Sequence, residues 1–155
     1  MIGTPQAPTD AMDFWLPVVV VIVGNSLLFV FCSIVKDNSW IDAYWGISFI
    51  LPIAAIWIKR ASMPDNYFSG GEAITPQMIL SFCCVCIWGL RLAQHIARRH
   101  TKEDFRYVDF RNRWSTNGTF WLYVQFYLKI FILQAIFSLI VNSAALYTAI
   151  YSDAK

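Results

Sequence analysis

The 155-residue chain is 57% hydrophobic and 14% charged, whereas soluble globular domains contain about 25% charged residues. This composition indicates an integral membrane protein, and a net charge of +2 is too small to indicate a nucleic-acid partner. The four cysteines all lie in apolar segments, and Cys83 and Cys86 have CxxC spacing without a second pair or a supporting histidine. We therefore expect neither a metal site nor a disulfide framework.

Hydrophobic segments follow a polar, proline-containing tail at residues 1–13. The first three cover about residues 14–35, 40–58 and 76–99. Each has about the 20 residues needed to cross a ~30 Å hydrocarbon core. The turn at residues 36–39 is short, so the first two segments are expected to be antiparallel neighbours.

The last hydrophobic stretch, residues 119–151, is too long for a simple crossing, because one helix of this length would measure ~48 Å. We expect its aromatic first part to lie at the interface and its span to cover about residues 130–150. Residues 14–155 are thus predicted to form one all-α transmembrane domain. It has about four membrane-spanning helices and an interfacial, charged connection between the third and the fourth.

Basic residues are distributed unevenly between the two sides of this topology. The turn at 36–39, the end of the third segment and the charged connection at 100–118 carry seven lysines and arginines, against three on the other side. The positive-inside rule therefore predicts that the connection faces the cytoplasm or a matrix-like compartment, with both termini opposite. We expect an anchoring role on this basic side for Arg99, Lys102, Arg106, Arg111 and Arg113.

Three ionisable residues fall within the hydrophobic segments, namely Asp42, Arg91 and Lys129. A charged side chain at the centre of a membrane helix costs at least ~2.5–3.5 kcal/mol. In the predicted topology all three lie in one leaflet, close to the basic side. We expect Asp42 and Arg91 to form an ion pair and Lys129 to extend its amine to the headgroups.

Helical spacing places the charged residues of the second and third segments on one face each. Packed together, these faces would line a polar cleft that opens on the basic side. The cleft is either one wall of a cofactor or headgroup site or a structural ion pair that holds two helices in register, and the residues alone favour the second interpretation. Its predicted members are Asp42, Trp45, Trp88, Arg91, His95, Arg98 and Lys129.

A stripe of polar and small residues follows helical spacing in the last segment and indicates a helix–helix interface. Its members are Gln134, Ser138, Asn142 and Ala145.

Three stretches carry a resemblance to a known family. They are SWIDAYWGISFI at residues 39–50, WGLRLAQHIARR at 88–99 followed by EDFRY at 103–107, and KIFILQAIFSLIV at 129–141. In order and spacing they resemble the membrane reductase family related to the steroid 5-alpha-reductases, in particular its uncharacterised branch.

Members of that family are multi-span enzymes that typically use NADPH to reduce a carbon–carbon double bond in a steroid or lipid. The resemblance implies that Arg91, Asp104, Arg106 and Tyr107 lie near the cofactor-side surface. Family members continue into further spans and a C-terminal box that supplies much of the nicotinamide-cofactor site. The present sequence ends at Lys155 without that box and resembles the N-terminal half of the fold.

These observations lead us to expect a non-catalytic accessory subunit of a larger membrane complex, with no catalytic residue and no cofactor. A mitochondrial inner-membrane, energy-transducing complex of the respiratory chain is the proposed setting, and the endoplasmic reticulum membrane is the alternative. The expected partners are other membrane subunits and phospholipids. The alternative functions are an NADPH-dependent reductase completed by a partner chain and a lipid-binding remnant of such an enzyme.

Overall fold

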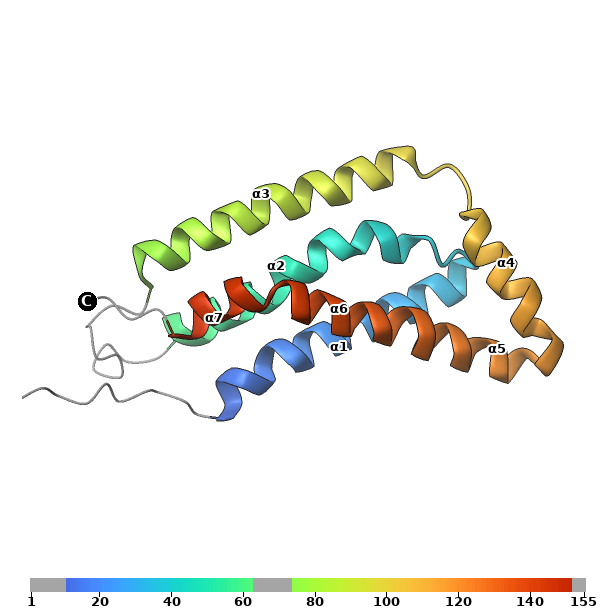
Figure 1. Cartoon of the computed structure of the whole chain (residues 1–155), viewed down its shortest axis with the longest axis horizontal. Helices are drawn as coiled ribbons and strands as arrows, with labels where there is room; N and C mark the ends of the chain where they lie inside the picture. Colours follow the sequence, from blue (N-terminus) through green and yellow to red (C-terminus); the bar gives the residue numbers. More distant parts are fainter. Residues whose placement is uncertain (1–10, 63–73, 152–155) are drawn as a thin grey trace, which may run out of the picture.

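The computed structural model describes residues 11–62 and 74–151, and it is helical without strands over these residues (Figure 1). Helices α1 (Ala11–Val35), α2 (Trp40–Ala61) and α3 (Pro76–Arg99) run along the length of a bundle, and α4 (Phe105–Trp114) lies across one end of it. The predicted all-α membrane protein with a charged connection before its last span is confirmed. Of the predicted polar tail, residues 1–10 lie outside the part that the structure describes.

A nearly continuous rod completes the bundle and is built from several short helical segments (Figure 1). After the 3-10 turn η2 (Ser115–Asn117) come α5 (Thr119–Phe126), the π-helical segment η3 (Tyr127–Ile132), α6 (Leu133–Val141) and α7 (Ser143–Tyr151).

Four helices in the described ranges are long and apolar enough to cross a membrane: Phe14–Val35, Trp40–Ala61, Pro76–Arg99 and Thr119–Val141. The last of these differs from the expected span at 130–150. The helix continues through the aromatic stretch and is interrupted only at Asn142, whose backbone leaves the helical region with φ −82° and ψ 0°.

Helices α2 and α3 approach each other closely at a pair of glycines. A methyl group added to Gly46 would lie 2.1 Å from the carbonyl oxygen of Gly89, and one added to Gly89 would lie 2.5 Å from the carbonyl oxygen of Gly46. Only residues without a side chain allow two membrane helices to come this near. The pair therefore decides which face of α3 turns towards α2.

Side-chain hydrogen bonds connect the rod to α2 at two positions along the bundle. Asn142, at the interruption of the rod, donates a hydrogen bond from Nδ2 to the carbonyl oxygen of Phe49 at 2.9 Å, and it is 5% exposed. Arg60, near the end of α2, donates from Nη1 to the carbonyl oxygen of Ile150 at 2.9 Å. Ser138 of the predicted stripe is also buried, which agrees with a helix–helix interface.

The apolar core is divided between the two ends of the bundle. At the end covered by α4 it consists of Cys32, Ile41, Tyr107, Leu122, Phe126 and Phe131. At the opposite end it consists of Ile53, Ile56, Leu146 and Ala149. Helix α4 therefore closes the first cluster with the ring of Tyr107, and this fixes the end of the bundle where the charged residues gather.

Candidate functional site

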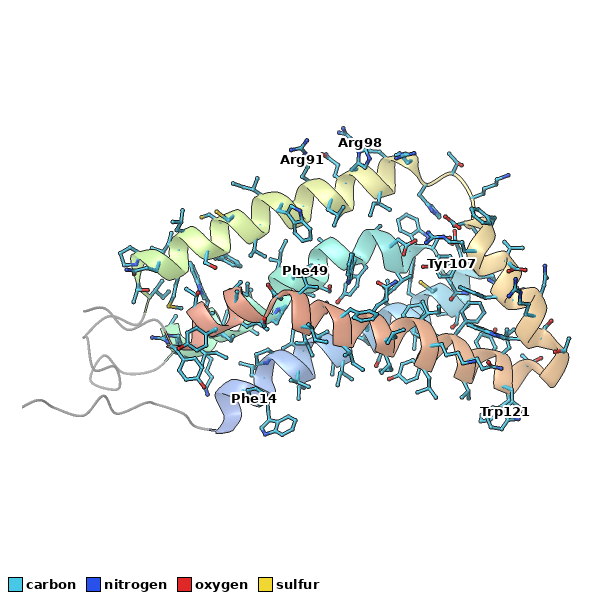
Figure 2. All side chains as sticks on the ribbon, in the orientation of Figure 1. Phe14, Phe49, Arg91, Arg98, Tyr107 and Trp121 are labelled. Atoms are coloured by element: carbon cyan, nitrogen blue, oxygen red, sulfur yellow. The ribbon has the colours of Figure 1, made fainter. Side chains whose placement is uncertain are left out.

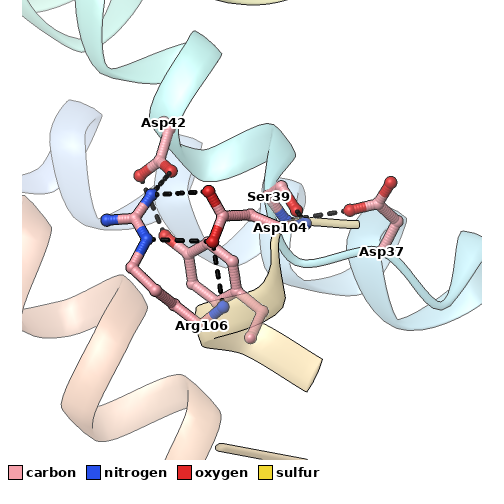
Figure 3. Close-up of polar contacts among 6 residues, drawn as sticks. Asp37, Ser39, Asp42, Asp104 and Arg106 are labelled. Atoms are coloured by element: carbon pink, nitrogen blue, oxygen red, sulfur yellow. Dashed lines mark hydrogen bonds and ion pairs between the residues drawn. The ribbon is translucent and has the colours of Figure 1, made fainter. Parts of the chain in front are cut away.

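Asp42, in the first turn of α2, has two partners on α4 (Figure 3). Arg106 Nη2 donates to Asp42 Oδ2 at 3.0 Å, and the hydroxyl of Tyr107 donates to Asp42 Oδ1 at 2.8 Å. Both carboxylate oxygens are therefore occupied. The charge that looked isolated within the second hydrophobic segment is satisfied from the helix that lies across the bundle end.

The expected ion pair between Asp42 and Arg91 is wrong. Arg91 lies on the exposed outer side of α3 and points away from the bundle (Figure 2), and it contacts no carboxylate among the described residues. The two residues do lie at similar depths in the membrane, as predicted. Gly46 and Gly89 are in contact, and Asp42 is four residues from the first while Arg91 is two residues from the second, both towards the basic side. The prediction was wrong about the face of α3 that packs against α2. The contact between the glycines turns the face that carries Arg91 outwards.

Asp104 organises the connection between α3 and α4. Its side chain accepts from the backbone nitrogen of Arg106 at 2.9 Å, which caps the N-terminus of α4, and it accepts from Arg106 Nε and Nη2 at 3.0 and 3.1 Å. Its own backbone nitrogen donates to Ser39 Oγ at 2.7 Å. Asp104 thus holds Arg106 in position for Asp42, as the close-up in Figure 3 shows.

The turn between α1 and α2 is also held by residues of the connection between α3 and α4. Glu103 Oε1 accepts from the backbone nitrogen of Asn38 at 3.1 Å and from Arg111 Nη2 at 2.6 Å, and Asp37 Oδ2 lies 2.8 Å from His100 Nε2. The sequence pattern did not indicate roles for Glu103 and Asp37. The mixed charges after the third segment were the available signal, because they lie at the same membrane side as the turn.

Burial and charge shift the pKa values in this cluster. Hydrogen bonds from Arg106 lower the pKa of Asp104, and the same bonds raise the pKa of Arg106. Burial, followed by the charge of Asp42, raises the pKa of Tyr107, a residue that is 3% exposed. Tyr107 is therefore held as a neutral donor to a carboxylate rather than as a group that readily releases its proton.

An open cleft of about 1030 Å³ lies beside this cluster, between the end of α3, the linker at residues 100–104 and α4. Its charged and histidine residues are Asp42, His95, Arg99, His100, Lys102, Glu103, Asp104, Arg106 and Asp109. Trp45 forms part of the wall, and its indole nitrogen is buried without an acceptor among the residues that the structure describes.

The structure brings together only part of the predicted cleft. Asp42, Trp45 and His95 line the observed cleft, whereas the four other predicted members do not. Arg91 and Arg98 point away on the outer side of α3 (Figure 2). The remaining two have separate contacts: Trp88 packs edge-on against Phe49, and Lys129 donates to Gln125 at 2.8 Å and lies over the ring of Trp114.

The predicted anchoring residues gather at the same end. Three of them, Arg99, Lys102 and Arg106, line the cleft. The other two lie on α4 and each contact an acidic side chain, Arg111 with Glu103 and Arg113 with Asp109. No group of three or more histidine, cysteine or acidic residues in residues 11–62 and 74–151 is placed to hold a metal ion.

The fold and this charged bundle end define a multi-pass, all-helical membrane protein with an open polar cleft at one membrane surface. Residues 28–155 match the family described as "Protein of unknown function (DUF1295)", and the chain belongs to this family, which is a steroid 5-alpha-reductase-like family. No curated protein and no solved structure matches the chain.

Proposed function

We propose that the chain is a non-catalytic accessory subunit of a larger membrane complex, and that α3 supplies its contact with a neighbouring subunit. The observation that carries the proposal is the outer face of α3. This face combines apolar residues with polar ones, although it belongs to a candidate span. It consists of Leu80, Ile87, Arg91, Gln94 and Arg98, all of them exposed.

Neither lipid nor water alone suits this face. Leu80 and Ile87 are 67% and 71% exposed, so water would leave two large apolar side chains uncovered. Arg91 follows one turn after Ile87, and exposing its guanidinium to hydrocarbon carries a cost, which reaches ~2.5–3.5 kcal/mol at the centre of a membrane helix. A second helix with an acidic or carbonyl partner for Arg91 would cover both kinds of residue.

Site-specific photo-crosslinking in the native membrane tests the proposal. A benzophenone amino acid at Ile87 is expected to give a discrete crosslinked protein, and Arg91→Leu is expected to weaken that product. Leu27 of α1 is the matched control, because it is 67% exposed on a helix with an apolar outer surface. Lipid adducts alone at both positions would contradict the proposal.

The cellular setting is part of the same proposal. We propose the inner mitochondrial membrane, in an assembly of the respiratory-chain kind, since such complexes contain many small helical accessory chains, and the endoplasmic reticulum is the alternative. Fractionation of organelles, followed by native electrophoresis of the complex that contains the chain, distinguishes the two settings.

A second candidate function is an NADPH-dependent reductase of a lipid or steroid double bond, completed by a partner chain, with this chain as the N-terminal half of the enzyme. Membership of a steroid 5-alpha-reductase-like family favours it. The cations of the cleft fit a phosphate group, and Arg99 and Lys102 would hold it. NADPH would supply the hydride. Purified complex that oxidises NADPH only when an enone lipid is present would establish this function and overturn the first.

A further inference from the structure

Side chains of both charges line the cleft, and the two groups are called here its carboxylate wall and its cationic wall. On one wall Arg106 is shared between Asp42 and Asp104, so one guanidinium faces two carboxylates and one negative charge remains. On the other wall Arg99 and Lys102 contact no carboxylate in the described part of the chain, and Arg99 lies 3.5 Å from the ring of His95. A ligand that matches both groups of side chains carries a cation and an anion.

The side chains below the cleft change in character with depth. Along α2, Trp45 lies one turn deeper than Asp42, or ~4.5 Å, and Phe49 lies another ~6 Å deeper on the same face. The indole nitrogen of Trp45 is a buried donor with no acceptor within residues 11–62 and 74–151. Phe49 is buried and packs edge-on with Trp45 at 5.6 Å and with Trp88 of α3 at 5.1 Å, and the half-exposed ring of Trp88 is the outer member of this aromatic cluster.

We propose that this cleft binds one zwitterionic phospholipid. The phosphate lies against Arg99 and Lys102, and the ammonium lies against the carboxylates of Asp42 and Asp104. An ester carbonyl at the next level lies against the exposed part of the Trp45 ring, and an acyl chain follows the exposed face of Trp88. The order of side chains from the bundle end inwards is the order of chemical groups in the lipid, with charges outermost, then the ester, then the hydrocarbon.

This inference does not depend on the neighbouring subunit proposed above. That subunit would contact the exposed Ile87 and Arg91 of α3, neither of which lines the cleft, whereas the cleft is lined by the end of α3, by α4 and by Trp45 of α2. An aminophospholipid also fits better than a purely anionic one, because phosphatidylglycerol has no cation for the carboxylate wall.

Native mass spectrometry of the full chain tests the proposal. The chain is released from nanodiscs that contain equal amounts of dioleoyl-phosphatidylethanolamine and dioleoyl-phosphatidylglycerol, and the retained lipid is identified. We expect one retained phosphatidylethanolamine. Arg99→Gln is expected to reduce its retention about tenfold, the effect of one lost charge-assisted hydrogen bond. Retention of phosphatidylglycerol instead, or of no lipid, would overturn the proposal.

Arg98→Gln is the matched control, because Arg98 is the adjacent arginine and points away from the bundle (Figure 2). It is expected to leave retention unchanged, and an equal loss in both variants would show only general attraction to the membrane surface. Asp42→Asn keeps an acceptor for Tyr107 while removing the charge, so it is expected to abolish the preference for phosphatidylethanolamine. Soluble glycerophosphoethanolamine distinguishes headgroup binding from lipid binding, and full displacement at equal concentration would rule out a role for the acyl chain.

Discussion

Replacing Gly46 with alanine perturbs the contact that sets the arrangement of α2 and α3. The added methyl group would lie 2.1 Å from the carbonyl oxygen of Gly89 and 3.1 Å from the backbone nitrogen of Ala93. Ordinary contacts of a Cβ atom begin near 3.4 Å, so the helices must separate by more than an ångström or slide past each other. Both obstructing atoms belong to the backbone and cannot rotate away as a side chain can.

The expected loss is ~2–3 kcal/mol of unfolding free energy, at the upper end of the cost of overpacking. Gly24→Ala provides the matched comparison, since its methyl group would lie 2.2 Å from the hydroxyl of Tyr44, the far end of a side chain. We expect that variant to lose less than ~1 kcal/mol, because Tyr44 can turn aside.

Unfolding in mixed micelles at increasing dodecyl sulfate fraction measures both variants on one scale. The double variant Gly46→Ala with Gly89→Ala should lose less than the sum of the single losses, because the first methyl group already separates the helices. Equal losses for Gly46→Ala and Gly24→Ala, or strictly additive losses in the double variant, would refute the close backbone contact as the determinant.

Two further predictions concern the charged bundle end. A double-mutant cycle between Asp42→Asn and Arg106→Gln should give a coupling of ~0.5–1 kcal/mol, modest because Arg106 is 53% exposed, whereas a cycle between Asp42→Asn and Arg91→Gln should give none. Tyr107 has a raised pKa in the folded protein, so its stabilising effect is fully present below the unfolded value of about 10 and is lost as the pH rises towards the folded value. Thermal unfolding between pH 8 and 11 should therefore weaken more steeply for the native chain than for Tyr107→Phe, and parallel curves would contradict the assignment.

Hydropathy and turn length were sufficient to predict the fold class and the first three helices, because a membrane span is a local property of about 20 residues. The course of the last stretch was not predictable in the same way. The interruption at Asn142 coincides with a tertiary contact, the hydrogen bond from Asn142 to the carbonyl oxygen of Phe49. Composition carries no information on such a bond.

The partner of Asp42 could not be predicted from the sequence pattern. Helical periodicity established which residues share a face on α3 and placed Arg91 at nearly the depth of Asp42. It did not establish which face of α3 meets α2, since that depends on how closely Gly46 and Gly89 approach. Nor did it show that the linker folds back far enough for α4 to bring Arg106 and Tyr107 to Asp42.

The contacts also change what the family resemblance means for this chain. The stretch SWIDAYWG contributes Ser39, Asp42 and Gly46, and each of them contacts a residue of the other resembling stretch. Ser39 and Asp42 meet the EDFRY block, and Gly46 meets Gly89 of WGLR, so the motif residues are partners of one another. A motif whose members are engaged in holding helices together identifies a fold, and function has to be argued from the groups that remain available. In this chain those groups are Lys102 of the connection between α3 and α4, together with Arg99, Trp45 and the excess carboxylate charge of Asp42 and Asp104, which belong to the resembling stretches themselves but line the cleft. They are the basis for proposing that the cleft recognises a lipid.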